Sequence, residues 1–227
     1  MLAHKRAVAI AFLALSFLAK LFPLILLPAF LQKADRAGTR LRTAPAFARD
    51  RVPAWLGATL FAGVAFLGYV PYLGGGGNLF QGLSDYAAGW EANDSAFRLI
   101  LGAGNSKGQA ELVASVMLLA LVAYALRSRM EPLRASLWLT AGFVLLSPNA
   151  FPWYFTWSIP FLCFFPYAPW LLLSVTAVLG YSPVVAYAAG QPYRDSPFVL
   201  ALEYVPVYMW LGIRLGRGMI ADLRATF

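Results

Sequence analysis

Charged residues are scarce in this sequence. Asp, Glu, Lys and Arg make up 12% of the 227 residues, and 60% of the residues are hydrophobic. A soluble domain is about a quarter charged and about half apolar. A water-soluble fold cannot hide this much apolar surface, because most of the hydrophobic segments lack a polar face. The composition therefore predicts an all-α, polytopic integral membrane protein.

Cysteine and histidine each occur once, as Cys163 and His4. These counts exclude an internal disulfide, a Cys/His metal site and a histidine-based catalytic triad. No Gly-rich phosphate loop follows a strand pattern, and Gly74–Gly77 follows a hydrophobic run, where we interpret it as a flexible exit. No cluster of residues in the sequence predicts a set of metal ligands.

The net charge is +8, and Lys and Arg gather between the hydrophobic runs. This pattern is typical of membrane topology and does not favour nucleic-acid binding. A membrane helix needs about 20 apolar residues, and short broken helices add to the count, so we predict about seven or eight membrane segments in one domain over residues 1–227. The runs that carry these segments are residues 7–31, 53–73, 111–126, 135–146, 153–165, 170–187 and 198–213.

Most of the Lys and Arg residues lie in segments 32–51 and 127–134 and at the C-terminus. The positive-inside rule places these segments in the cytoplasm and the loops 74–110 and 188–197 on the outer side. Near the N-terminus, a hairpin that turns at Lys20–Pro23 puts the basic residues before the first run on the cytoplasmic side as well. A single tilted helix is the alternative, and we favour the hairpin.

The segment LSPNAFPWYFTWSIP, residues 146–160, interrupts this hydrophobic stretch. The run before it, 135–146, makes about 18 Å of helix, whereas the apolar slab is about 30 Å thick. The bend at Ser147–Pro152 should therefore lie below the outer surface, where non-helical backbone is tolerated only inside protein or beside a wet cavity. We predict a recess that opens away from the cytoplasm; an interfacial turn with an aromatic belt is the alternative.

The outer loop 74–110 carries apolar residues at helical spacing, which predicts an amphipathic interfacial helix at about 79–101. Its apolar face is formed by Leu79, Leu83, Tyr86, Trp90, Phe97 and Leu101. Asn93-Asp94-Ser95 matches a glycosylation acceptor, a match that we attribute to chance. Lys20 and Glu203 are ionisable residues inside hydrophobic runs, and such residues usually face a site or a partner.

Three segments, in this order along the chain, resemble the GT-C superfamily of glycosyltransferases, and family 87 with its bacterial mannosyltransferase-like relatives in particular. They are LAKLFPLILLPAFL, GLSDYAAGWEANDSAFRLI and LLSPNAFPWYFTWSIPFL. Members of this family are about twice as long, and their catalytic acid lies in a first outer loop that has no counterpart here. The resemblance therefore leaves three interpretations: the chain is the C-terminal part of a larger GT-C membrane domain, a second chain supplies the N-terminal half, or activity has been lost.

The resemblance implies a glycosyltransferase of the bacterial plasma membrane. It would transfer a hexose, with mannose as the first candidate, from a polyprenyl-phosphate donor to a lipid or glycan acceptor at the outer face. The base is expected outside this chain, and Asp85 and Asp94 are the candidates within it. Members of the superfamily can use a divalent metal. A transporter or flippase half and a non-catalytic membrane protein are the alternatives.

The resemblance also implies roles for individual side chains. The phosphate of the donor would meet cationic groups, and the sugar or the acceptor would lie against polar and aromatic groups of the broken segment. The candidates for the phosphate are Lys20, Arg98 and Arg194, and those for the sugar or acceptor are Asn149, Trp153, Tyr154 and Trp157.

Overall fold

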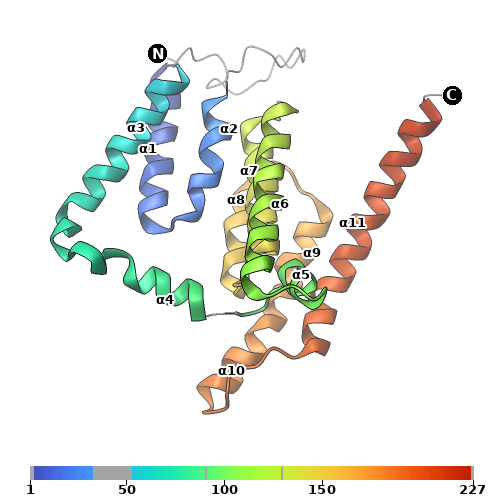
Figure 1. The fold of residues 1–227 in the computed structure, drawn as a ribbon. Coiled ribbons are helices and arrows are strands. Elements are labelled where there is room, and N and C mark those ends of the chain that lie inside the picture. The colour runs from blue at the N-terminus through green and yellow to red at the C-terminus, as the bar shows by residue number, and fades with distance from the viewer. Residues whose placement is uncertain (1–2, 33–52, 90, 129, 226–227) are drawn as a thin grey trace. The chain divides into compact units, whose positions relative to one another are not determined.

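The computed structural model describes residues 3–32, 53–89, 91–128 and 130–225 (Figure 1). Residues 33–51 of the predicted cytoplasmic segment 32–51 lie outside these residues, and so does Trp90 of the predicted amphipathic face. The chain forms two compact units. The first unit comprises residues 1–89 and 117–139, and the second comprises residues 90–116 and 140–227. Each unit is described by itself below.

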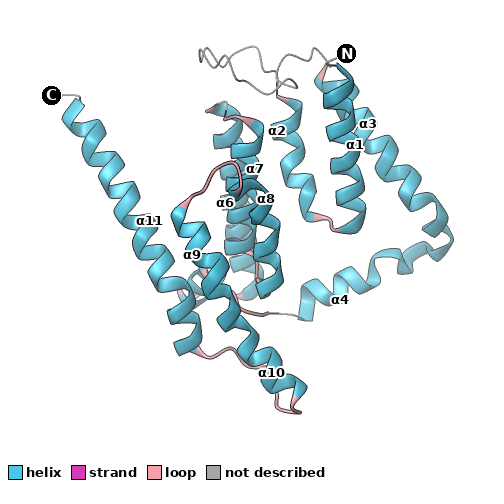
Figure 2. Cartoon of the chain, turned by 180° about the vertical axis from the view of Figure 1, so that it is seen from behind, coloured by secondary structure: helices cyan, strands magenta, loops and turns pink. Residues whose placement is uncertain are grey.

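The described residues are helical, with short loops between the helices and no strand among them (Figure 2). The first unit contains α1 (Ala3–Ala19), the 3-10 helix η1 (Phe22–Leu26), α2 (Leu27–Leu31), α3 (Ala54–Tyr69), η4 (Val70–Phe80) and α4 (Gln81–Gly89). Two helices, α6 (Lys107–Arg127) and α7 (Pro132–Leu146), are each divided between the units. The start of α6 and the end of α7 belong to the second unit, and the rest of both helices belongs to the first. The all-α prediction is thus confirmed.

The N-terminal run is a hairpin, as predicted. The α1 helix ends at Ala19, and η1 and α2 return alongside it (Figure 1). The buried Arg6 side chain closes the open end of the hairpin by donating to Phe30 O (2.7 Å) and Gln32 O (2.8 Å). These bonds satisfy carbonyl groups that the end of α2 leaves without helical partners.

The second unit contains α5 (Ala96–Gly102), η5 (Pro152–Ser158), α8 (Ile159–Leu162), α9 (Ala168–Thr176), η6 (Ala177–Tyr181), α10 (Ser182–Ala188) and α11 (Pro197–Ala225). A small apolar cluster joins α5 to the start of α6, where Phe97 packs on Ala110 and Ala114. The α9 helix packs on α11.

Three helical stretches are long and apolar enough to cross a membrane: residues 54–86, 107–127 and 168–188. Four shorter apolar helices accompany them: Arg6–Ala19, Phe22–Leu31, Pro132–Leu146 and Pro197–Ile213. The predicted number of seven or eight segments depends on whether these short helices enter the bilayer, and it stays a prediction.

The predicted single amphipathic helix at 79–101 is wrong. The chain forms two helices there, α4 and α5, and residues 91–95 between them are not helical. Leu83 of α4 is exposed, whereas Phe97 of α5 is fully buried. The helix ends because the backbone of Ala92 pairs with residues near Pro148, an interaction between distant parts of the sequence that replaces the local helical bonds.

The predicted end of the fourth run is confirmed, since α7 stops at Leu146. Gly74–Gly77 lies within η4, and Gly76 has a positive φ of 53°. This glycine allows the kink inside η4, because side chains with a Cβ rarely adopt that conformation.

Candidate functional site

Residues 147–152, which we call the break segment, join α7 to η5 and are held by hydrogen bonds to the loop before α5. Ala92 N–H donates to Pro148 O (3.0 Å), and Ala150 N–H donates to Ala92 O (2.8 Å). These two bonds make an isolated parallel bridge between Ala92 and Asn149. A proline has no amide proton and interrupts helical bonding, so a loop from elsewhere in the chain supplies the missing partners here.

Asn93 is the residue that connects the break segment to the last helix. Its backbone N–H donates to Asp195 Oδ2 (2.9 Å). Its side-chain Nδ2 donates to Ala150 O (3.0 Å), Glu203 Oε1 (3.0 Å) and the Tyr204 hydroxyl (3.3 Å). The Tyr204 hydroxyl in turn donates to Asn93 O (2.8 Å). We call this set of bonds the Asn93 network.

The α11 helix contributes three side chains to the same region. Glu203 is fully buried, and Tyr204 is 4% exposed. The Tyr208 hydroxyl donates to Ser95 Oγ (3.0 Å). Pro206 disturbs the helical bonding of the preceding turn, and Thr176 Oγ1 donates to the Glu203 carbonyl (3.1 Å). A threonine hydroxyl thus bonds to a carbonyl in the turn before a proline, as is common in apolar surroundings.

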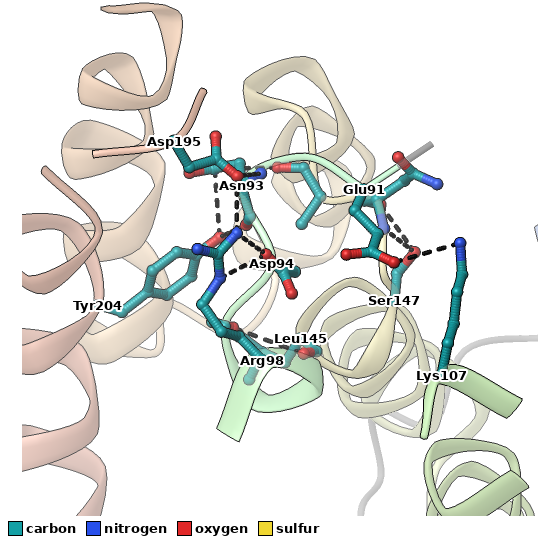
Figure 3. A network of polar contacts seen from close by, with 12 residues as sticks. Glu91, Asn93, Asp94, Arg98, Lys107, Leu145, Ser147, Asp195 and Tyr204 are labelled. Atoms are coloured by element: carbon teal, nitrogen blue, oxygen red, sulfur yellow. Dashed lines mark hydrogen bonds and ion pairs between the residues drawn. The ribbon is translucent and has the colours of Figure 1, made fainter. Parts of the chain in front are cut away.

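Arg98 lies between two buried carboxylates, and Figure 3 shows its guanidinium reaching both of them. Nε and Nη2 donate to Asp94 Oδ1 at 2.8 and 2.6 Å, and Nη2 also donates to Asp195 Oδ2 at 2.9 Å. The side chain of Arg98 is 42% exposed, against 1% for Asp94 and 5% for Asp195. The two carboxylates therefore balance the positive charge from the buried side.

Burial raises the pKa of the Asp94 carboxyl above its ordinary value, and the hydrogen bond and charge of Arg98 offset only part of that effect. Burial lowers the pKa of Arg98, but the hydrogen bond from Arg98 to Asp94 and the charges of Asp94 and Asp195 outweigh it, so the pKa rises. Burial, and then the Asp195 charge, raise the pKa of the Tyr193 hydroxyl. Tyr193 is therefore an un-ionised phenol at neutral pH.

An aromatic cluster begins at the break segment and consists of Phe151, Trp153, Tyr154 and Trp157. The rings of Phe151 and Trp153 are stacked, with centroids 4.5 Å apart and planes 6° apart. Tyr154 stacks on Trp157 with centroids 4.3 Å apart, and it meets Trp153 edge to face. The edge of the Tyr193 ring contacts Phe151, which joins the cluster to the segment that carries Asp195.

Residues 99–215 match the model of a protein family described as the MptB C-terminal domain. This match covers just over half of the chain. The chain belongs to the MptB C-terminal domain family. Searches of curated proteins and of solved structures found no match.

Membership in this family makes the chain a mannosyltransferase-related membrane protein, which agrees with the coarse prediction from sequence. The matched residues include the break segment, the aromatic cluster and most of α11. The finer assignment to glycosyltransferase family 87 and the identity of donor and acceptor remain predictions.

The second unit brings together most of the predicted site residues of this family member. Trp153 is 40% exposed, Trp157 is half-buried, and Tyr154 and Asn149 are buried. Arg98 and Asp94 form the ion pair described above. Arg194 is exposed in the loop before α11. Lys20 and Asp85 are exposed and belong to the first unit, where Lys20 forms the turn of the hairpin and Asp85 lies on α4.

Sequence reasoning missed the residues that hold this site together, which are Asn93, Asp195 and Tyr204. Asn93 was visible only as part of a glycosylation triplet, and its burial to 1% exposure makes it unsuitable as an acceptor. Glu203 gave a usable signal, because a charge inside a hydrophobic run predicts a partner. The side chain that bonds to Glu203 is Asn93.

The described residues contain no group of three or more His, Cys, Asp or Glu side chains arranged to hold a metal ion. Asp94, Asp195 and Glu203 are all near Asn93, but two of them are engaged by Arg98 and the third by Asn93. Asp94, Asp195 and Glu203 thus each use one carboxylate oxygen in the internal hydrogen bonding of the second unit.

Proposed function

We propose that this chain contributes the acceptor- and donor-binding region of a membrane glycosyltransferase of the GT-C type. The reaction is transfer of a hexose, with mannose as the first candidate, from a polyprenyl phosphate to a lipid or glycan acceptor at the outer face of a bacterial plasma membrane. The observation that carries this proposal is the family match over residues 99–215, because that stretch contains the break segment with its aromatic cluster.

The aromatic cluster supports a role in sugar binding. An exposed ring held rigidly by stacked neighbours offers a flat apolar surface at small entropic cost, and the C–H face of a pyranose fits such a surface. Trp153 meets this requirement, because it is 40% exposed and backed by Phe151. Tyr154 meets Trp153 edge to face and is itself stacked on Trp157, and Asn149 contributes to the backbone that carries them.

For the phosphate of the donor, the exposed cations Lys20 and Arg194 are the first candidates. Arg98 is a weaker electrostatic partner for an anion, because Asp94 and Asp195 already compensate its charge. Nevertheless Nη1 of Arg98 is not engaged by either carboxylate, and hydrogen bonding to a phosphate oxygen is open to it. A developing phosphate charge is stabilised by such preorganised donors.

The acceptor hydroxyl needs a base that takes its proton. Asp94 does not meet this need, since its side chain is 1% exposed and bound by Arg98. Asp85 is exposed and belongs to the first unit, apart from the aromatic cluster in sequence. We therefore propose that the base comes from residues outside this chain, in an N-terminal half supplied with it or by a second polypeptide. A divalent metal, which members of the superfamily can use, would likewise need ligands beyond the described residues.

The experiment measures sugar transfer in membranes from a strain that lacks the gene and is complemented with wild-type or variant protein. Labelled polyprenyl-phosphate mannose is the donor, and lipid and glycan fractions are the acceptors. Trp153→Ala and Lys20→Ala should each lower transfer by about tenfold, the loss of one well-placed contact of about 1.4 kcal/mol. Trp55→Ala, at an exposed position of α3, is the matched control and should retain activity.

Complemented membranes that transfer no more sugar than the deletion strain would refute the proposed function. Full activity in both Trp153→Ala and Lys20→Ala would refute the assignment of the site while leaving the reaction intact.

A further inference from the structure

We propose that Asn93 is the positioning residue of the aromatic cluster. Bonds to α11 and to Asp195 hold Asn93 in place, and Asn93 fixes the backbone from which Trp153 projects. Neither family membership nor the proposed function assigns this residue a role. The catalytic consequence rests on the proposed function, but the structural consequence does not.

The connection from Asn93 to Trp153 is short. Asn93 Nδ2 donates to the carbonyl of Ala150, and the neighbouring Ala92 bonds to both Pro148 and Ala150. Two residues after Ala150 the 3-10 helix η5 begins, and Tyr154 N–H donates to Phe151 O (2.8 Å) within its first turn. The direction in which η5 starts, and with it the place of Trp153, therefore depends on where Ala150 is held.

The other side of Asn93 is anchored by three groups that lie far away in sequence. Asp195 Oδ2 accepts its backbone N–H, Glu203 Oε1 accepts from its side chain, and the Tyr204 hydroxyl bonds to its carbonyl. Asn93 thus shares its two side-chain N–H groups between the break segment and α11. Because Asn93 is buried, each of these bonds satisfies a polar group that would otherwise be costly to bury.

The position also demands this residue type. Asn93 has a φ of 51°, a left-handed conformation that asparagine tolerates better than most residues do. An aspartate could keep the backbone, but it would lose both donors and place a third carboxylate beside Asp195 and Glu203. Gly180 of η6 leaves room for the side chain, because a Cβ there would lie 2.8 Å from Asn93 Nδ2 and 3.0 Å from Pro152 Cγ.

The test uses the full-length chain in native membranes and measures the reactivity of individual tryptophans toward an oxidant by mass spectrometry. The loss of one buried hydrogen bond shifts an equilibrium by about fivefold. Asn93→Asp and Asn93→Gly should therefore change the oxidation rate of Trp153 by about that factor. Trp55, which is 67% exposed on α3 in the first unit, should react at an unchanged rate. This comparison needs no activity, so it is decided even if the proposed function is wrong.

Two milder variants cover the case in which the Asn93 variants do not fold. Tyr204→Phe removes the hydroxyl that donates to Asn93 O, and Gly180→Ala pushes on Asn93 and Pro152 without removing any group. Both should alter the reactivity of Trp153 in the same direction as the Asn93 variants. Gly212→Ala, a change on α11 into open space, is the matched control and should leave it unaltered.

If transfer activity is present, the same variants should raise KM for the donor or the acceptor by about fivefold and change kcat less, because the platform for binding is displaced while the base is untouched. The proposal is overturned if Trp153 in Tyr204→Phe and Gly180→Ala reacts as in the wild type. It is overturned equally if the folded Asn93 variants lose thermal stability but keep the reactivity of Trp153.

Discussion

The two units of this chain are held together in different ways. In the first unit, α1 and α3 pack through apolar surfaces such as the ring contact between Phe17 and Phe61. In the second unit, hydrogen bonds of buried polar groups join distant segments near the break. Among the described residues, the buried polar side chains of the second unit include Asn93, Asp94, Asn149 and Glu203, whereas Arg6 and Ser136 are those of the first.

The difference follows from the state of the backbone. Intact helices satisfy their own polar groups, so their association needs only close packing, and small residues such as Gly57 permit it. A broken helix exposes N–H and C=O groups that must find other partners. We conclude that polar side chains gather where prolines have interrupted helices, and that the candidate site lies at that place for this reason.

The largest effect on the difference between the units is expected from removing Arg98, the cation between the two buried carboxylates of the second unit. Arg98→Ala leaves Asp94 and Asp195 buried without their partner, which should lower the free energy of unfolding by about 2–3 kcal/mol, less than for a fully buried pair because Arg98 is 42% exposed. Unfolding in detergent, followed by circular dichroism, measures the loss. The double variant Arg98→Ala with Asp94→Asn should recover part of it, and no recovery would contradict the ion-pair account.

A smaller effect is expected from tightening the packing of the first unit. A Cβ at Gly57 would lie 2.7 Å from Leu31 Cδ2 and 2.8 Å from Ile10 Cδ1, so these side-chain ends must shift, and Gly57→Ala should lose most of the roughly 0.5–1 kcal/mol that a helical Gly→Ala change contributes. Gly63 on the same helix faces open space, and Gly63→Ala should instead stabilise the protein by about 0.5–1 kcal/mol through helix propensity. Thermal unfolding of the pair decides the matter, since equal effects at both positions would argue against packing on α1.

Removing a single hydroxyl group should also cost more stability in the second unit than in the first. Tyr208→Phe removes the hydroxyl that donates to Ser95 Oγ, and it should cost about 0.5–1 kcal/mol. Ser16→Ala removes an exposed hydroxyl that bonds to Phe12 O within α1, and its effect should stay within about 0.5 kcal/mol. A larger loss for Ser16→Ala than for Tyr208→Phe in the same unfolding assay would be inconsistent with a polar second unit and an apolar first unit.

The smallest predicted effect concerns pH. Burial raises the pKa of Asp94 above its ordinary value of 3.8, while Arg98 and Asp195 are the charged groups that face it. A group with a raised pKa in the folded state stabilises the fold below its ordinary pKa, and this contribution is lost as the pH rises through the raised value. The contribution of Asp94 to stability should therefore fall as the pH rises above about 4. Asp94→Asn should flatten that part of the profile, and an unchanged slope would contradict the direction given for Asp94.

The sequence was sufficient for features governed by local rules. Pro148 predicts the end of α7 at Leu146, because proline disfavours a helical residue before it. Lys20–Pro23 predicts the turn of the hairpin, since a charge beside a proline is unfavourable in the middle of a membrane helix. The contiguity of Trp153, Tyr154 and Trp157 also follows from their closeness in sequence.

The interruption between α4 and α5 could not be foreseen in this way. The spacing from Leu79 to Leu101 fits one helix, and only the bonds of Ala92 to residues near Pro148, more than fifty positions away, explain the break. The same reasoning applies to Asn93, whose partners Ala150, Asp195 and Glu203 are all distant in sequence. Local propensity carries no information on such pairings, so the residues that hold the break segment in place could not be predicted from the sequence.

The bridge between Ala92 and Asn149 has a consequence for amide exchange with heavy water. Non-helical amides usually exchange within the earliest time points, because few bonds must open to release them. The amides of Ala92 and Ala150 are bonded across the bridge, and both residues are fully buried. They should exchange as slowly as amides in the middle of α7, and an exchange map should therefore show two protected points within the two loops.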